Sequence, residues 1–348
     1  MIINKNKIKN GGHRKPSNNI SNTNIDNLHN INININNKGN FINIGTHNVR
    51  GFNLETKQAE FFEEYTNLNL DIIGFTETKL TEKQSGYTQT NNKKYKSWWT
   101  GYPDKTRTGG VELAIKRGLN KHVANVIKKM GRLISLDLYF KGGAKTRIIN
   151  LYVNCNEQEK NERNKLIDEL KILIREAEHK NLNLIVMGDL NADAEKFDNM
   201  YKINTKGKYK IIETLRNKGL YDTQAISNIG ELEPTWKKNE ITSRRIDYIW
   251  VSENIVQELI ITKVHTNEML RTDHNLLVMT METKKIYGNK SRADERRKKI
   301  TRTIYNYKEM NEEKWKNFRE KLNNNTDLLR FNREYRIDDK NQKWTNRV

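Results

Sequence analysis

Ten side chains that could bind a metal ion, move a proton or donate a hydrogen bond lie at or near the ends of short apolar runs. In chain order they are Asn48, Glu77, Tyr152, Asp189, Asn191, Thr235, Trp236, Asp247, Asp273 and His274. A carboxylate or amide at the end of a buried segment is costly unless it is paired or holds a metal. One such residue carries little information, but a series of them predicts a site assembled from many strand ends.

The acidic and amide members suit the hydrolysis of a phosphodiester with a hard divalent cation. Mg²⁺ binds one or two carboxylates together with waters and substrate, and it neutralises charge on a phosphoryl group. Glu77 is the expected principal ligand, with Asn48 and Asp273 close by. The alternative for Glu77 is a position beside a helix N-cap.

Two further pairs suit proton transfer. Asp189 and Asn191 are two residues apart, so an extended chain places both side chains on one face. An acceptor for a proton of water would then stand beside an amide that fixes the phosphate or the water, although a turn cap is the alternative. Asp247 is a candidate carboxylate to orient His274, because a hydrogen bond to one ring nitrogen fixes the tautomer and raises the basicity of the other.

The apolar runs that carry these residues predict buried strands. The expected strands cover 41–49, 71–78, 96–102, 111–116, 133–140, 147–154, 183–191, 245–252, 259–266 and 275–282. Helical spacing predicts helices over 54–68 and 157–179. Glu112 is a charge inside an expected strand, where a small apolar residue would suit better. Many strands with few helices between them indicate two packed sheets with helices outside.

In their order, and with ETK after DII and TDH near the domain end, these motifs resemble the endonuclease/exonuclease/phosphatase superfamily. Within it, the sequence is most similar to apurinic endonucleases and the endonuclease domains of non-LTR retrotransposons. The resemblance covers roughly residues 41–283. It implies an α/β (α+β) fold, a four-layer αββα sandwich of two mixed β-sheets flanked by helices. It also implies a Mg²⁺-dependent endonuclease, with Mn²⁺ as an alternative ion, that leaves 3′-hydroxyl and 5′-phosphate ends in DNA.

The resemblance also implies roles for the catalytic residues. Asp189 would activate the attacking water and Asn191 would contact the phosphate. His274 and Asp247 would form a dyad at the scissile phosphate, with Asp273 on the metal side.

For the substrate contacts, the resemblance implies that the Tyr152 hydroxyl meets the phosphate, where several phosphatase branches have a histidine. Thr235 and Trp236 would lie near the bound strand. Of Arg244 and Arg245, one is expected at the surface and one at a phosphate, and Arg245 is taken as the contact. Several departures from the family pattern remove no catalytic group; they are Thr76 for Gln, Asn154 for Pro and Thr272 for Ser.

The net charge of +20 is concentrated in the flanks. Residues 1–40 carry six Lys/Arg against one Asp and form an expected disordered, Asn-rich basic arm. Residues 284–348 form an expected basic linker and helical tail, with a helix near 307–322 that packs on protein or, as an alternative, contacts DNA. Basic arms neutralise phosphates and favour nucleic acid as a partner. A merely solvated tail is the alternative.

Other classes find little support. A lone cysteine, Cys155, excludes an intramolecular disulfide framework and suggests a reducing compartment. The chain has no apolar run of 18 residues and no secretory h-region, so we expect a nuclear or cytoplasmic monomer without a membrane partner. The expected partner is DNA, with RNA as a second candidate. The alternatives for function are a phosphatase or RNA nuclease of the same fold, or an inactive nucleic-acid-binding remnant of a retroelement.

Overall fold

The computed structural model describes residues 41–102, 109–140, 143–199, 207, 209–228, 232–239, 241–283 and 311–334. The chain divides into two compact units, Met1–Lys290 and Ser291–Val348. The expected disordered arm over 1–40 and the basic cluster over 284–299 lie outside the described residues. The domain boundaries expected from the sequence therefore stay predictions.

The first unit contains two six-stranded sheets. Sheet A has the strand order β13-β14-β1-β2-β4-β3, and sheet B the order β5-β6-β7-β8-β12-β9. Each sheet is mixed, because β1 and β2 run parallel, as do β7 and β8, whereas the other neighbours are antiparallel. The strands of sheet A are β1 (Phe41–Asn48), β2 (Ile72–Thr76), β3 (Tyr95–Thr100), β4 (Val111–Lys116), β13 (Leu259–His265) and β14 (Leu276–Glu282). Those of sheet B are β5 (Val123–Lys129), β6 (Leu133–Tyr139), β7 (Lys145–Tyr152), β8 (Asn183–Asp189), β9 (Tyr221–Asp222) and β12 (Asp247–Val251).

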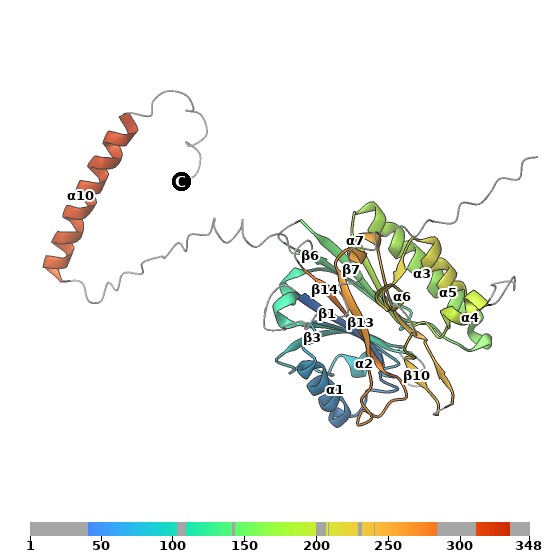
Figure 1. Ribbon diagram of the computed structural model, residues 1–348. Helices are drawn as coiled ribbons and strands as arrows, with labels where there is room; N and C mark the ends of the chain where they lie inside the picture. Colours follow the sequence, from blue (N-terminus) through green and yellow to red (C-terminus); the bar gives the residue numbers. More distant parts are fainter. Residues whose placement is uncertain are drawn as a thin grey trace, which may run out of the picture. The chain divides into compact units, whose positions relative to one another are not determined.

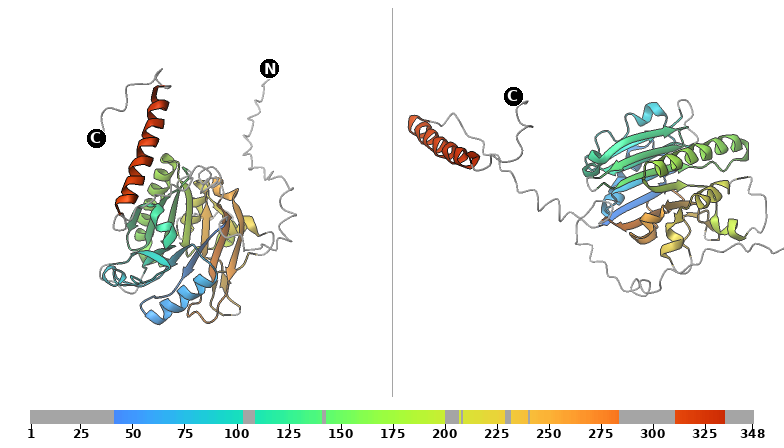
Figure 2. Two further views of the ribbon diagram at one scale, coloured as in Figure 1. Left: turned by 90° about the vertical axis from the view of Figure 1, so that its left-hand side faces the viewer. Right: turned by 90° about the horizontal axis from the view of Figure 1, so that it is seen from above.

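Helices cover the outer faces of the two sheets (Figure 1; Figure 2). Helix α1 (Glu55–Asn67) packs on sheet A through Phe61, Phe62 and Tyr65. Helices α3 (Lys160–His179) and α5 (Lys210–Asn217) pack on sheet B. The shorter helices are α2 (Glu82–Ser85), η2 (Arg117–His122), η3 (Glu157–Glu159), α4 (Ala194–Asn199), α6 (Thr223–Ser227) and α7 (Glu253–Val256). A further short pair of strands, β10 (Trp236–Lys237) and β11 (Ser243–Arg244), forms a hairpin.

This arrangement confirms the predicted four-layer sandwich. The apolar faces of the two sheets meet in a core of Ile, Leu, Val and Met side chains. Asn150 of β7 crosses this core and donates hydrogen bonds to the backbone oxygens of Phe75 and Glu112 in sheet A. Gly74 makes room for it, since a Cβ there would lie 2.7 Å from the Asn150 amide.

Glu112 occupies the opposite face of β4, under α1, where it is completely buried. Neither of its carboxylate oxygens has a hydrogen-bond partner among the described residues. Burial raises the pKa of Glu112 well above its usual value, because the charged form loses its solvation. Strand β4 forms as predicted, with this buried acid opposite Phe75 and Trp99 of the neighbouring strands.

The β1–β2 ladder continues beyond both strands. Backbone hydrogen bonds join Gly51 N to Glu77 O and Phe52 N to Thr78 O, at 2.7 and 2.8 Å. On the other side, Thr78 N and Lys79 N bond to the oxygens of Gly110 and Gly109. The segment after β2 is consequently held along both edges.

The second unit contains helix α10 (Glu312–Glu334). It begins and ends later than the helix expected near 307–322. The rings of Trp315 and Phe318, one turn apart, meet edge to face at 5.9 Å. Among the described residues, every helix is too short or too polar to cross a membrane.

Candidate active site

The strand register brings the expected residues to one end of the sandwich. In sheet B, Tyr152 of β7 is opposite Asp189 of β8, which in turn is opposite Asp247 of β12. In sheet A, Asn48 at the end of β1 pairs with Thr76, and Glu77 follows directly. Since β14 is antiparallel to β1, the segment that precedes β14 reaches the same end. Asp273 and His274 lie in that segment.

A cavity of about 290 Å³ opens at this end. It is lined by Arg50, Glu77, Tyr152, Cys155, Asp189, Asn191, Trp236, Arg244, Ile246, Asp273 and His274. Seven of the ten predicted side chains are in this lining. The other three lie behind it, and each contacts a residue of the lining or its immediate neighbour, as described next.

Asn48 links the two acids of the cavity. Its amide nitrogen donates to Glu77 Oε1 at 3.1 Å and to Asp189 Oδ2 at 2.9 Å, while its oxygen accepts from Arg50 N. In this arrangement the Asn48 amide nitrogen faces the two acids and its oxygen faces the backbone, and its expected role as a metal ligand stays a prediction. The second oxygen of Asp189 accepts from Asn191 N at 2.9 Å, so both oxygens of Asp189 are oriented.

Asp189 is buried and lies among other acids. Burial, followed by the charge of Asp247, raises the pKa of Asp189 to about 8, although His274 and the hydrogen bond from Asn48 oppose this. In its ionised form, Asp189 is therefore a stronger base than an ordinary carboxylate.

His274 and Asp247 form a buried pair. His274 Nδ1 donates to Asp247 Oδ2 at 2.8 Å, and Nε2 lies 3.9 Å from Asp273 Oδ1. Burial alone would lower the pKa of His274, but the charge and hydrogen bond of Asp247, with smaller effects of Asp189 and Asp273, raise it to about 9. The ring therefore carries a positive charge at neutral pH.

The two carboxylate oxygens of Asp273 differ in their hydrogen bonding. Oδ2 accepts from Arg50 at 2.7 Å and from Trp236 Nε1 at 2.9 Å. Oδ1 is buried and has no hydrogen-bond partner among the described residues. Among the described residues, Lys79 forms the one ion pair with Glu77, at 3.6 Å. The unpartnered Asp273 oxygen and the Glu77 carboxylate belong to residues that line the same cavity, and carboxylate oxygens suit a hard divalent cation.

A second group of potential ligands consists of Asp189, Asp247 and His274, whose ligand atoms lie within 4.8 Å of one another among the described residues. Their proximity is accounted for by the hydrogen bond between His274 and Asp247. Glu77 and Asp273 are the better candidates for holding an ion, because their side chains are 19% and 26% exposed, whereas Asp247 is fully buried, and a hard divalent cation keeps several waters.

The backbone around the cavity is strained. Arg50, Glu77, Lys79 and Asn191 all have positive φ, between 46° and 55°. Such conformations cost of order 1–3 kcal/mol each in residues other than glycine. They persist here because the flanking backbone hydrogen bonds fix the turns, and three of the four residues, Arg50, Glu77 and Asn191, line the cavity.

The ring of Tyr152 packs against the guanidinium group of Arg132. The guanidinium of the buried Arg132 lies 5.3 Å from the Tyr152 ring, and Arg132 is itself bonded to Tyr102 and Glu159. Burial and the charges of Glu77 and Asp189 raise the pKa of Tyr152, so its hydroxyl remains a donor.

Two expected substrate contacts are placed otherwise by the structure. Arg245 is 4% exposed, and its guanidinium group forms ion pairs with Asp222 and Glu195. It does not line the cavity. Arg244 lines the cavity instead and lies over the Trp236 ring at 5.8 Å. Adjacent residues of an extended chain point to opposite faces, so only one of the two can face the cavity.

Thr235 is the second expected substrate contact that the structure places away from the cavity. It is fully buried, and its hydroxyl accepts hydrogen bonds from the backbone nitrogens of Ile246 and Asp247. It therefore positions Asp247 and cannot meet a substrate directly. Trp236 lines the cavity, and its expected position near the bound strand stays a prediction.

Sequence reasoning assigned no role to two lining residues, Arg50 and Cys155, or to Lys79, which pairs with Glu77. Arg50 and Lys79 each follow an expected acid or amide by two residues, in NVR and ETK. This spacing was a usable signal for cations beside the acids. Cys155 is exposed at the cavity and has no such signal.

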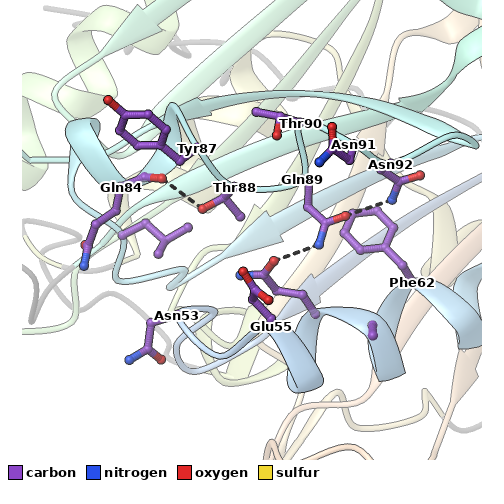
Figure 3. A pocket seen from close by; sticks show the side chains of 13 residues that line it. Asn53, Glu55, Phe62, Gln84, Tyr87, Thr88, Gln89, Thr90, Asn91 and Asn92 are labelled. Carbon is purple, nitrogen blue, oxygen red and sulfur yellow. Dashed lines mark hydrogen bonds between the residues drawn. The ribbon is translucent and has the colours of Figure 1, made fainter.

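A larger cavity, of about 610 Å³, lies between α1 and the segment after α2 (Figure 3). Amides and hydroxyls dominate its lining, and Glu55 is its one carboxylate. Several amides bond to each other, as Gln89 does to Gln58 and Asn92. Its lining holds no pair of acids and no histidine, so the chemistry belongs to the smaller cavity.

Comparison with known proteins agrees with this placement. The family model described as Endonuclease-reverse transcriptase matches residues 146–278, from β7 into β14. That span includes every predicted site residue except Asn48 and Glu77. No curated protein sequence matches the chain significantly.

Solved structures share the fold at low identity. The 3′ phosphatase NExo from Neisseria, bound to a product DNA hairpin, is 19% identical, with 68% of this chain and 98% of that chain covered and a TM-score of 0.54. The AP endonuclease LMAP from Leishmania major is 16% identical, with 70% and 88% covered and a TM-score of 0.56. The endonuclease domain of TRAS1, a telomere-specific non-LTR retrotransposon, is 15% identical, with 69% and 98% covered and a TM-score of 0.50.

Proposed function

We propose that the chain is a metal-dependent DNA endonuclease of the endonuclease/exonuclease/phosphatase superfamily, a proposal that its fold and the family model over 146–278 support. It would hydrolyse one strand at a time and leave 3′-hydroxyl and 5′-phosphate ends. Mg²⁺ is the proposed ion and DNA the proposed partner.

One observation carries the proposal. Asp189, held through both oxygens, and the charged His274 of the Asp247 pair line the same cavity as Glu77 and Asp273. A proton acceptor, a cationic donor and a pair of acids able to hold a cation are what phosphodiester hydrolysis requires.

Each residue then has a distinct task. Asp189 accepts a proton from the attacking water, since its two oxygens are aimed by Asn48 and by the backbone of Asn191. The Nε2–H of His274 and the Tyr152 hydroxyl donate to the phosphoryl oxygens. Their hydrogen bonds strengthen as negative charge builds on those oxygens in the transition state.

Glu77 and Asp273 would hold the divalent ion. When bound, such an ion offsets charge on the phosphoryl group and on the leaving oxygen. Arg50 and Lys79, which partner these acids, and Arg244 add positive charge at the rim of the cavity. A polyanionic strand would be attracted to this rim, and the attraction should weaken with salt.

The test is nicking of supercoiled plasmid by the full chain with Mg²⁺ or with EDTA. We expect Mg²⁺-dependent nicks that DNA ligase reseals without prior treatment, because ligation needs a 3′-hydroxyl beside a 5′-phosphate. Glu77→Ala and His274→Ala should abolish nicking, whereas the exposed His179→Ala on α3 should not.

Plasmid that stays intact in every condition, with salt-sensitive binding retained, would contradict the nuclease and favour an inactive binding remnant. Release of phosphate from a 3′-phosphorylated oligonucleotide without nicking would favour a phosphatase.

A further inference from the structure

One face of helix α1 reaches the loops that carry the catalytic residues. Lys57, Phe61 and Tyr65 are four residues apart, so they lie one above another on the helix. Lys57 is 7% exposed, and its ammonium group donates to Val49 O at 2.6 Å and to Arg271 O at 3.0 Å. It thereby joins the end of β1, beside Asn48, to the segment before Asp273.

Tyr65 reaches the same segment through a second histidine. The Tyr65 hydroxyl lies 2.7 Å from His47 Nδ1, and His47 Nε2 lies 3.0 Å from the backbone oxygen of His274. Burial lowers the pKa of His47 to about 3, so the ring is neutral and has one N–H. Because the carbonyl can only accept, Nε2 carries the proton and Nδ1 accepts from Tyr65.

The hydrogen bonds of Lys57 and His47 thus hold the backbone oxygens at the two ends of the segment 271–274. Between these ends, the hydroxyl of Thr272 donates to Asn48 O at 2.8 Å. The exposed pair Arg271–Glu60, at 3.7 Å, adds a weaker link to the same helix. The backbone of Asp273 and His274 is thus fixed against β1 by side chains that do not line the cavity.

We propose that Lys57 and the Tyr65–His47 pair are positioning residues of the active site. They set where Asp273 and His274 stand relative to Asn48 and Glu77. The proposal rests on the proposed function, because it concerns the geometry of the same reaction. A displacement of about 1 Å at a reacting centre can lower a rate about 100-fold.

The side chains of Lys57 and Tyr65 are buried, so replacing either also destabilises the fold. A matched control is therefore needed. Gln58, the next residue on α1, is 4% exposed and donates to Phe52 O at 2.6 Å. It ties the same helix to a backbone carbonyl, but it has no bond to 271–274 among the described residues. Loss of the Gln58 bond should cost stability without moving the site.

The experiment compares Lys57→Met, Tyr65→Phe and Gln58→Met in the full chain. Stability is measured by urea unfolding, and plasmid nicking is measured well below each unfolding midpoint. We expect kcat to fall at least about tenfold in Lys57→Met and Tyr65→Phe with KM little changed, and to stay within about twofold in Gln58→Met. Lys57→Arg, which keeps donors at this place, should recover part of the loss.

A second readout does not depend on cleavage. The ring resonances of His274, recorded by NMR without metal, should shift in Lys57→Met and Tyr65→Phe but not in Gln58→Met. If all three variants lose stability alike, keep kcat and leave the His274 signal in place, the positioning role is wrong. If the wild type never nicks DNA, the proposed function fails, and the His274 signal alone then decides this proposal.

Discussion

Replacement of Asp247 by asparagine would test whether a buried carboxylate sets the charge of His274. Asparagine keeps an oxygen that can accept from His274 Nδ1, so the 2.8 Å contact can persist while the negative charge is lost. Burial lowers the pKa of His274, and Asp247 is the largest of the influences that raise it to about 9. The rise of the pKa from its ordinary value of 6.5 corresponds to about 3 kcal/mol of stabilisation of the charged ring. We therefore expect the pKa of His274 to fall by about two units or more in Asp247→Asn.

The same shift predicts how stability depends on pH. The pKa of His274 is higher in the folded than in the unfolded chain, so the pairing stabilises the fold fully below pH 6.5 and is lost as the pH rises through about 9. Asp247→Asn should unfold more easily than the wild type at pH 6, by up to about 3 kcal/mol. The difference in the free energy of unfolding between the wild type and the variant should shrink as the pH rises from 6.5 to about 9.

The assay is an NMR titration of the histidine rings in the metal-free protein, with His274→Gln to assign the signal and urea unfolding in parallel. His265, whose pKa burial lowers, is an internal reference that should not change. A wild-type His274 that titrates near 6.5, or a variant with the same pKa as the wild type, would refute the reasoning.

Three other perturbations follow from single side chains. Glu112→Gln should stabilise the protein at pH 8 and leave it unchanged near pH 4, because the raised pKa of Glu112 makes the fold lose stability as the pH rises above 4.5; urea unfolding at both pH values tests this. Alkylation of Cys155 with a bulky maleimide should block nicking, whereas Cys155→Ala should nick normally and resist the reagent, as a plasmid assay would show. Gly188→Ala should prevent folding, since its Cβ would lie 2.0 Å from Leu151 O, whereas Gly143→Ala, also at positive φ but with nothing within 4 Å, should cost only about 1 kcal/mol by thermal unfolding.

Much of the fold could be predicted because its strands are nearly uniformly buried. Continuous apolar runs such as that of β8 are typical of strands that are buried on both faces. Strand β5 was not predicted, because most of its residues are half-buried or exposed at the sheet edge and it has no apolar run. The same holds for the short α5, which has too few turns for its periodicity to stand out.

The site could be predicted as a set of residues but not as a set of contacts. The register of β8 with β12, which sets Asp189 against Asp247, could not be predicted, because both strands are buried almost throughout and no alternation of buried and exposed residues fixes their alignment. Which of Arg244 and Arg245 faces the cavity depends on the exact alternation at the start of β12, which sequence pattern does not fix. Lys57 and His47 were missed because their partners are backbone carbonyls, one of them 227 residues away, and a carbonyl leaves no mark on the sequence.

The continuation of the β1–β2 ladder past both strands has a consequence for motion. The amides of Gly51 and Phe52 lie outside any strand, yet their hydrogen bonds to the segment after β2 extend the sheet. They should exchange with solvent as slowly as strand amides do, even though exposed turns surround them. Asn48 and Glu77 would then move as one body, so the 3.1 Å hydrogen bond between them should break only when the end of the sheet opens.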